Sequence, residues 1–217
     1  MEQQNQNSEA QSASPVEVIA QVSRVVTKVV DRITGDRNDY PLMVAAACVE
    51  GLKGFGIEAR VMFGQAAWIE ILEDESLIWA GCWGDNLHFW VATQFGEVVD
   101  LNTSVAHRRR GHDTSMPNPI LSPPMVWARE VPRFYRYVPE GIAELELTDE
   151  QDQERYSKVL REVHEKCRPD AIIPGASPEF PNEPILCSGR RLLDDSNQSF
   201  KKFDRYLGVK GIPQSPF

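Results

Sequence analysis

The chain has 217 residues, enough for one domain with a full hydrophobic core or for one domain with extensions. Lysine and arginine total 23 against 32 aspartate and glutamate residues, a net charge of −9, and so acidic a chain repels a phosphate backbone, which excludes nucleic acid as a partner. The longest uncharged apolar run is too short to cross a bilayer, and the N-terminus lacks the basic and apolar regions of a secretory signal, so we expect a cytoplasmic protein with no membrane partner.

Cysteine usage points to reduced thiols. The four cysteines lie far apart and form no CxxC pair, a spacing that fits neither a zinc ribbon nor a disulfide scaffold. They are Cys48, Cys82, Cys167 and Cys187. No cofactor or metal motif stands out, so none is expected.

The N-terminal residues divide into a tail and a helix. Residues 1–14 are rich in Gln, Asn, Ser and Glu and predict a disordered tail. Ser14, Pro15 and Glu17 form a helix start, with a capping serine and a first-turn proline, and Gly35 is the expected end. We therefore expect one domain over residues 15–210, with a proline-rich C-terminal extension over about 168–217.

A second helix is expected from Pro41, with Tyr40 at the cap position, because proline is tolerated in the first helical turn. Its apolar surface is broad and made of small residues, which predicts a central helix packed deep against a sheet. Gly54 and Gly56 end it.

Short alternating runs predict strands after this helix. Gly64 is interpreted as a turn, and the aromatic-rich WAGCWGDN as part of a connection. The expected strands cover residues 57–63, 67–72, 87–94 and 97–101.

Strand alternation groups two polar side chains. His88 and Trp90 share one face of the third strand, and Asp100 follows in the next strand. A hairpin at Gly96 brings these strands together, so we expect an imidazole nitrogen of His88 within hydrogen-bond reach of Asp100.

Beyond these strands the pattern is less regular. Residues 102–125 predict a long irregular loop carrying His107, Arg108, Arg109, Arg110 and His112, either a solvated basic loop or an anion or metal site. An exposed helix is expected over 148–167, coil over 168–190 and a last helix over 197–207.

The runs LKGFGIEARVMFG and HFWVATQFGEVVDLN resemble the transglutaminase-like superfamily over about residues 38–104. The resemblance implies an α+β, papain-like fold with a central helix packed on an antiparallel sheet. It also implies a cysteine that attacks an amide or ester carbonyl, with His88 as the base and Asp100 as its orienter. Glu58 replaces the usual proline of the G-I-P-A-R motif.

The family's nucleophile opens the central helix, and its position falls at Pro41 or the flanking residues, none of which carries a thiol. Cys48 lies seven residues further on, about 10 Å deeper along the helix. We expect His88 to face the N-terminal end of this helix, near Tyr40 to Leu42, and Cys48 to be buried more than one turn away. Cys82 is either a packed loop residue or a neighbour of the same cleft.

Three functions stay open. The first is a transglutaminase-like fold that lacks the family's thiol chemistry and binds a protein or peptide partner through a cleft at His88 and Asp100. The second is an active cysteine hydrolase or acyltransferase that uses Cys48, or Cys82, with this pair. The third is a binding protein that uses an aromatic cleft around Trp79, Trp83 and Trp90.

Overall fold

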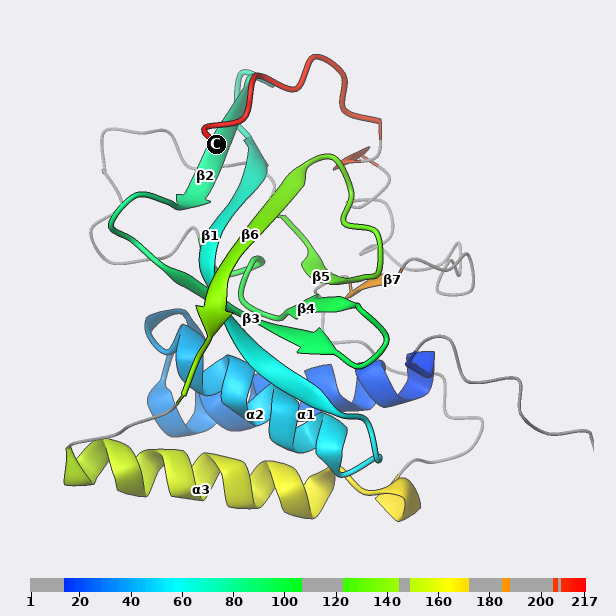
Figure 1. Ribbon diagram of the computed structural model, residues 1–217, viewed down its shortest axis with the longest axis vertical. Helices are drawn as coiled ribbons and strands as arrows, with labels where there is room; N and C mark the ends of the chain where they lie inside the picture. Colours follow the sequence, from blue (N-terminus) through cyan, green and yellow to red (C-terminus); the bar gives the residue numbers. More distant parts are fainter. Residues whose placement is uncertain (1–13, 107–122, 145–148, 172–184, 188–204, 207) are drawn as a thin grey trace, which may run out of the picture.

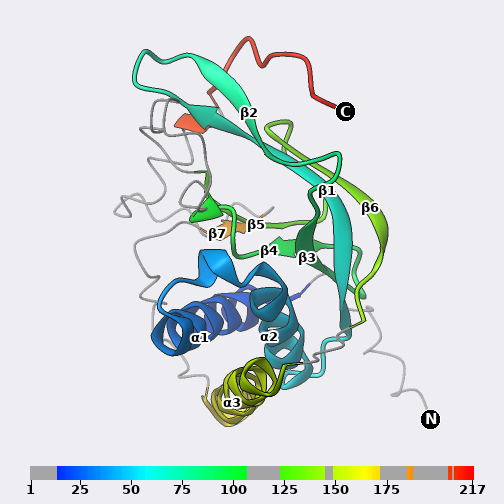
Figure 2. The ribbon, with the colours of Figure 1, turned by 90° about the vertical axis from the view of Figure 1, so that its left-hand side faces the viewer.

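The computed structural model describes residues 14–106, 123–144, 149–171, 185–187, 205–206 and 208–217. These residues form an α+β fold in which three helices gather on one side of a strongly curved, half-barrel sheet (Figure 1; Figure 2). The α+β prediction is confirmed. The predictions for residues 1–13, for the basic cluster 107–112 and for most of the C-terminal extension concern residues outside the described part of the chain.

The helices are α1 (Val16–Thr34), α2 (Pro41–Lys53) and α3 (Glu150–Lys166). They pack against one another below the sheet (Figure 2). The short 3-10 turns are η1 (Arg37–Asp39) and η3 (Pro169–Ala171). None of the described helices is long and apolar enough to span a bilayer.

The first helix begins differently from the prediction. Ser14 does not cap α1; Pro15 holds the cap position and no side chain caps the helix. Ser14 is buried instead, and its backbone N–H and hydroxyl donate to the Glu97 carboxylate at 3.0 and 2.6 Å. Ser14 therefore bonds to a carboxylate that is distant in sequence and does not cap the helix.

The sheet has six antiparallel strands, with a short seventh, β7, parallel to β5. Its strands are β1 (Ala59–Ile71), β2 (Leu77–Cys82), β3 (His88–Thr93), β4 (Val98–Asp100), β5 (Met125–Ala128), β6 (Tyr135–Ile142) and β7 (Ile185–Cys187). The turn predicted at Gly64 is wrong, because β1 runs through it as one strand. Gly64, at φ 155°, lies at a register shift against β6, where an added Cβ would meet the Val138 carbonyl at 2.3 Å.

Two strands share one edge of β1. Some residues of β1 pair with β6 on one edge and with β2 or β3 on the other edge. β2 and β3 therefore both lie on the edge opposite β6. Cys82, the last residue of β2, pairs with Ala66, and His88, the first residue of β3, pairs with Gly64. The exposed loop 83–87 leaves the sheet between them. The ends of this loop are therefore neighbours on the sheet.

The two sheet faces have different roles. Phe89, Val91 and Val99 project toward the helices and join the core that contains α1, α2 and α3. His88, Trp90 and Asp100 alternate with these residues and so project from the opposite, inner face. A second apolar cluster, including Trp68, Val126, Phe134 and Tyr135, covers the inner face farther along β1.

Candidate functional site

A histidine–aspartate pair lies on the inner face. Nε2 of His88 is 2.6 Å from Oδ2 of Asp100, and the two residues are 0% and 2% exposed. β3 and β4 are antiparallel neighbours, with Val91 opposite Val99, so Asp100 stands beside Trp90 and reaches His88 diagonally. The predicted contact between His88 and Asp100 is confirmed.

Asp100 accepts hydrogen bonds from three donors. Oδ2 accepts from His88 and, at 2.9 Å, from the Tyr137 hydroxyl; Oδ1 accepts from the backbone N–H of Asn102 at 2.9 Å. Each of these bonds favours the ionised carboxylate. Burial works in the opposite direction, but the His88 charge and the three donors outweigh it and hold the pKa of Asp100 below its usual range.

The imidazole is charged at neutral pH. Burial disfavours the imidazolium, but the Asp100 carboxylate, with further help from Cys82, outweighs burial and raises the pKa of His88 to about 9. The pair is therefore an imidazolium–carboxylate ion pair with almost no exposure to water.

Cys82 completes this arrangement. Its side chain hydrogen-bonds the His88 ring. The contact follows from the sheet, because Cys82 and His88 pair with Ala66 and Gly64, two residues apart on the same face of β1. A thiol, an imidazole and a carboxylate thus stand in line across β2, β3 and β4.

Aromatic rings enclose the imidazole. The Trp68 ring meets it edge-on at 5.6 Å, and the Trp90 ring stacks at 6.5 Å between centroids. Tyr137 packs on Trp90 at 5.2 Å. These rings exclude water and fix the ring plane of His88.

Cys48 does not join this group. It is 1% exposed on α2, within the core on the helix side of the sheet. Burial, followed by Cys167 and Asp100, raises the pKa of its thiol well above the ordinary value. The expectation that His88 faces the N-terminal end of α2 is wrong, because His88 shares its face with Trp90 and Asp100, whereas Phe89 and Val91 meet the helices.

Sequence reasoning missed one member of the site, Tyr137, and left Cys82 open between loop packing and the same cleft. Cys82 was assigned to a connection, yet it ends a strand that pairs with β1. Tyr137 comes from β6, which pairs with the other edge of β1 and places this residue opposite Ala66. Only the pairings with β1, distant in sequence, bring Cys82 to His88 and Tyr137 to Asp100; the one local signal is the HxW pattern.

The described residues contain no cluster of His, Cys, Asp or Glu side chains arranged to hold a metal ion. The predicted alternative at His107 and His112 lies outside the described part of the chain.

No protein-family model matches this chain, and no curated protein matches it significantly. A crystal structure described only as a genomics structure is similar at 14% identity with a TM-score of 0.44, over 74% of this chain and 82% of that chain.

Proposed function

We propose that the protein is a thiol-dependent hydrolase or acyltransferase of the transglutaminase-like kind, in which Cys82 is the nucleophile, His88 the acid and base, and Asp100 the orienter. The observation that carries this proposal is the placement of the His88 imidazole between Cys82 and Asp100. Cys82 takes the role that the sequence resemblance gives to a cysteine at the start of α2, where this chain has Pro41.

The proposed steps use these three side chains and one water molecule. An imidazolium beside a thiol favours the thiolate, which is the nucleophilic form. The sulfur attacks an amide or ester carbonyl; the carbon–sulfur bond forms, and the bond to the leaving group breaks as that group takes the proton from His88. His88 then accepts a proton from a water, which attacks the thioester and releases Cys82.

A substrate reaches Cys82 only when the site opens, because Cys82 is 2% exposed. The loop 83–87 joins the nucleophile to the base, and each of its five residues is exposed. Gly84 in this loop has a φ of 66°, which a glycine adopts without strain. We propose that movement of this loop lets a carbonyl reach the thiolate.

Acyl transfer is tested by trapping the acyl-enzyme with 4-nitrophenyl acetate and locating the acetyl group by peptide mass spectrometry. We expect a single acetylated cysteine, Cys82, formed with a burst of nitrophenolate. Cys82→Ala abolishes the burst, His88→Asn slows it by about 100-fold or more, and Cys48→Ala leaves it unchanged. Acetylation spread over surface lysines, with no burst, contradicts the proposal.

The second candidate is a binding or scaffold module that has the transglutaminase-like fold and no acyl chemistry. The burial of all three groups favours it, since His88, Cys82 and Asp100 are 0%, 2% and 2% exposed. In this case the ion pair fixes the arrangement of the strands, and a protein or peptide partner binds elsewhere on the surface. A chain that never acylates Cys82 but is destabilised by loss of His88 supports this candidate.

A further inference from the structure

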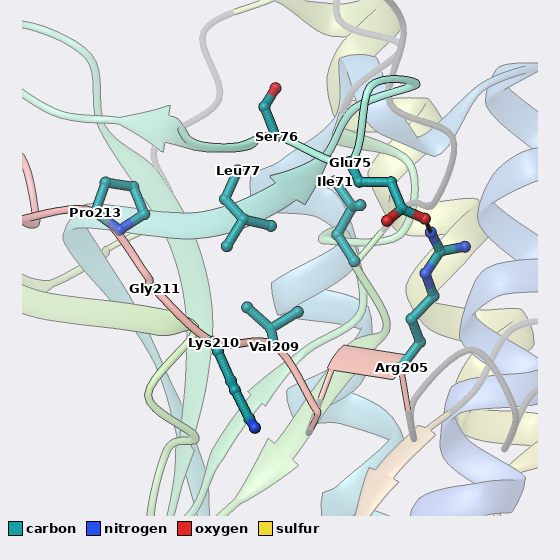
Figure 3. A pocket seen from close by; sticks show the side chains of 9 residues that line it. All are labelled: Ile71, Glu75, Ser76, Leu77, Arg205, Val209, Lys210, Gly211 and Pro213. Carbon is teal, nitrogen blue, oxygen red and sulfur yellow. Dashed lines mark hydrogen bonds and ion pairs between the residues drawn. The ribbon is translucent and has the colours of Figure 1, made fainter.

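Residues 208–217 form a segment, here called the strap, that lies beside the β1–β2 hairpin and ends next to β2 (Figure 1). Figure 3 shows Val209 and Pro213 along the hairpin, with the Val209 side chain directed toward Ile71 and Leu77. The first half of the strap therefore packs on the hairpin.

Two hydrogen bonds fix this first half to the sheet. The Arg133 guanidinium donates to the backbone carbonyl of Val209, a residue that is itself buried. Nε1 of Trp79 donates to the backbone carbonyl of Pro213 at 3.0 Å. The strap is therefore anchored up to Pro213.

Ring contacts hold the far end of the strap. The Phe217 ring packs on Trp83, with centroids 6.3 Å apart, and the Arg136 guanidinium lies 5.9 Å from the Phe217 centroid. Within the described part of the chain, residues 214–217 hydrogen-bond only to one another, between Ser215 and Phe217. Such ring contacts are weak at exposed positions, so this end leaves the sheet more readily than the anchored half.

The far end of the strap contacts the loop that must move for a substrate to reach Cys82. Trp83 directly follows Cys82 and is the first residue of the exposed loop 83–87. Arg136 lies on β6, which pairs with the edge of β1 opposite β2. Phe217 thus spans β1 and joins the start of the loop to a paired strand of the sheet.

Phe217 reaches the loop from outside the site. Arg136 and Tyr137 are consecutive in β6 and project from opposite faces of the sheet. Tyr137 bonds to Asp100 on the inner face, so Arg136, and Phe217 with it, lies on the outer face. The strap therefore acts on the loop and does not touch the His88–Asp100 pair.

We propose that the strap is an autoinhibitory device, in which Phe217 holds the loop 83–87 closed over Cys82 and release of Phe217 lets the loop open. The low exposure of Cys82, 2%, is then a property of the closed state. The inference rests on the proposed function for its consequence, because an open loop matters for acyl transfer only if Cys82 is the nucleophile.

Access to Cys82 is measured by iodoacetamide labelling of the full chain and peptide mass spectrometry, with Cys48 as the internal control. A thiol that reacts only in an open state is labelled at a rate that follows the population of that state. Phe217→Ala removes both ring contacts, so we expect Cys82 to be labelled about tenfold faster and Cys48 at its native rate. No increase at Cys82, or an equal increase at both cysteines, overturns the proposal.

Two further variants separate the ring contacts from a general disturbance of the strap. Phe217→Tyr keeps an aromatic ring, and Gln214→Ala changes an exposed residue of the same segment. We expect both variants to label Cys82 at close to the native rate. An increase in Gln214→Ala as large as in Phe217→Ala contradicts a role for the ring.

Acyl transfer is measured separately on the same variants with 4-nitrophenyl acetate. If Cys82 is the nucleophile, Phe217→Ala also speeds the burst of nitrophenolate. Faster labelling of Cys82 in Phe217→Ala, with no burst in any variant, supports the strap and contradicts the proposed function. A burst in the native chain, with labelling that Phe217→Ala leaves unchanged, contradicts the strap alone.

Discussion

Cys48 and Cys82 are similarly buried, at 1% and 2% exposure, but Cys48 belongs to α2 in the helix-side core and Cys82 ends strand β2 of the sheet. Cys48 lies among the apolar side chains of the helix-side core, where burial raises the pKa of its thiol. Cys82 lies against the His88 imidazole, which Asp100 keeps charged. Exposure therefore does not distinguish the two thiols, whereas the charge beside each one does.

The same comparison separates two kinds of core. The helix-side core contains aliphatic side chains such as Val26, Leu52 and Val91, and it tolerates similar apolar replacements. The inner face contains a buried ion pair whose partners depend on each other. Removing one partner there leaves an unpaired charge in an apolar surrounding, which costs far more than a small cavity.

The largest expected effect comes from Asp100→Ala, which leaves the His88 imidazolium buried without its carboxylate. We expect the free energy of unfolding to fall by about 3–5 kcal/mol, measured by urea denaturation at pH 7. In the double variant Asp100→Ala/His88→Ala, the free energy of unfolding falls by less than the sum of the falls in the two single variants, because no charge is then left unpaired. Strict additivity contradicts a direct interaction between the two residues.

A smaller effect is expected from pH. The pKa of His88 is raised from 6.5 to about 9 in the folded chain, so its contribution is complete below pH 6.5 and is lost as the pH rises through 9. The pKa of Asp100 is lowered, so its contribution is present above its ordinary value of 3.8 and is lost as the pH falls. Between pH 6 and 9.5 we expect the free energy of unfolding to fall by an amount on the order of 3 kcal/mol because His88 loses its proton.

This pH dependence is measured by urea denaturation of the native chain and of His88→Gln at each pH. The variant has no imidazole to titrate, so its stability should change much less over the same interval. Parallel curves for the two proteins would show that other groups cause the change.

The smallest effect is expected for Tyr137→Phe. This change removes one of the three hydrogen bonds to Asp100 and keeps the ring that packs on Trp90. We therefore expect the free energy of unfolding to fall by about 0.5–1.5 kcal/mol. Tyr40→Phe is the matched control, because its hydroxyl accepts from a partly exposed Arg155 at 3.2 Å and should contribute less. Equal losses in the two variants would contradict a specific role for Tyr137.

Local pattern predicted much of the framework. The helix starting at Pro41, the strand over His88–Thr93 and the exposed helix ending near Cys167 all appear where the sequence indicates them. The contact between His88 and Asp100 was also within reach, because one hairpin and strand alternation determine it. These features depend on neighbours in sequence.

The remaining features depend on long-range pairing. Alternation divides the residues of β3 between two faces of the sheet but does not indicate which face meets the helices. The predicted direction of the His88 side chain was therefore wrong. β1 continues through Gly64 because β6 and the β2–β3 pair hold it on both edges. Cys82 reaches His88 only because β2 and β3 lie end to end along β1, a relation that no local motif records.

The most direct test compares the alkylation rates of Cys82 and Cys48 in the native chain at pH 7. Iodoacetamide labelling followed by peptide mass spectrometry gives both rates in one sample, and their similar burial makes Cys48 an internal control. We expect Cys82 to react at least about tenfold faster than Cys48, and His88→Gln to remove most of this difference. Equal rates in the native chain, or a faster Cys82 that His88→Gln leaves unchanged, would contradict activation of Cys82 by the His88–Asp100 pair.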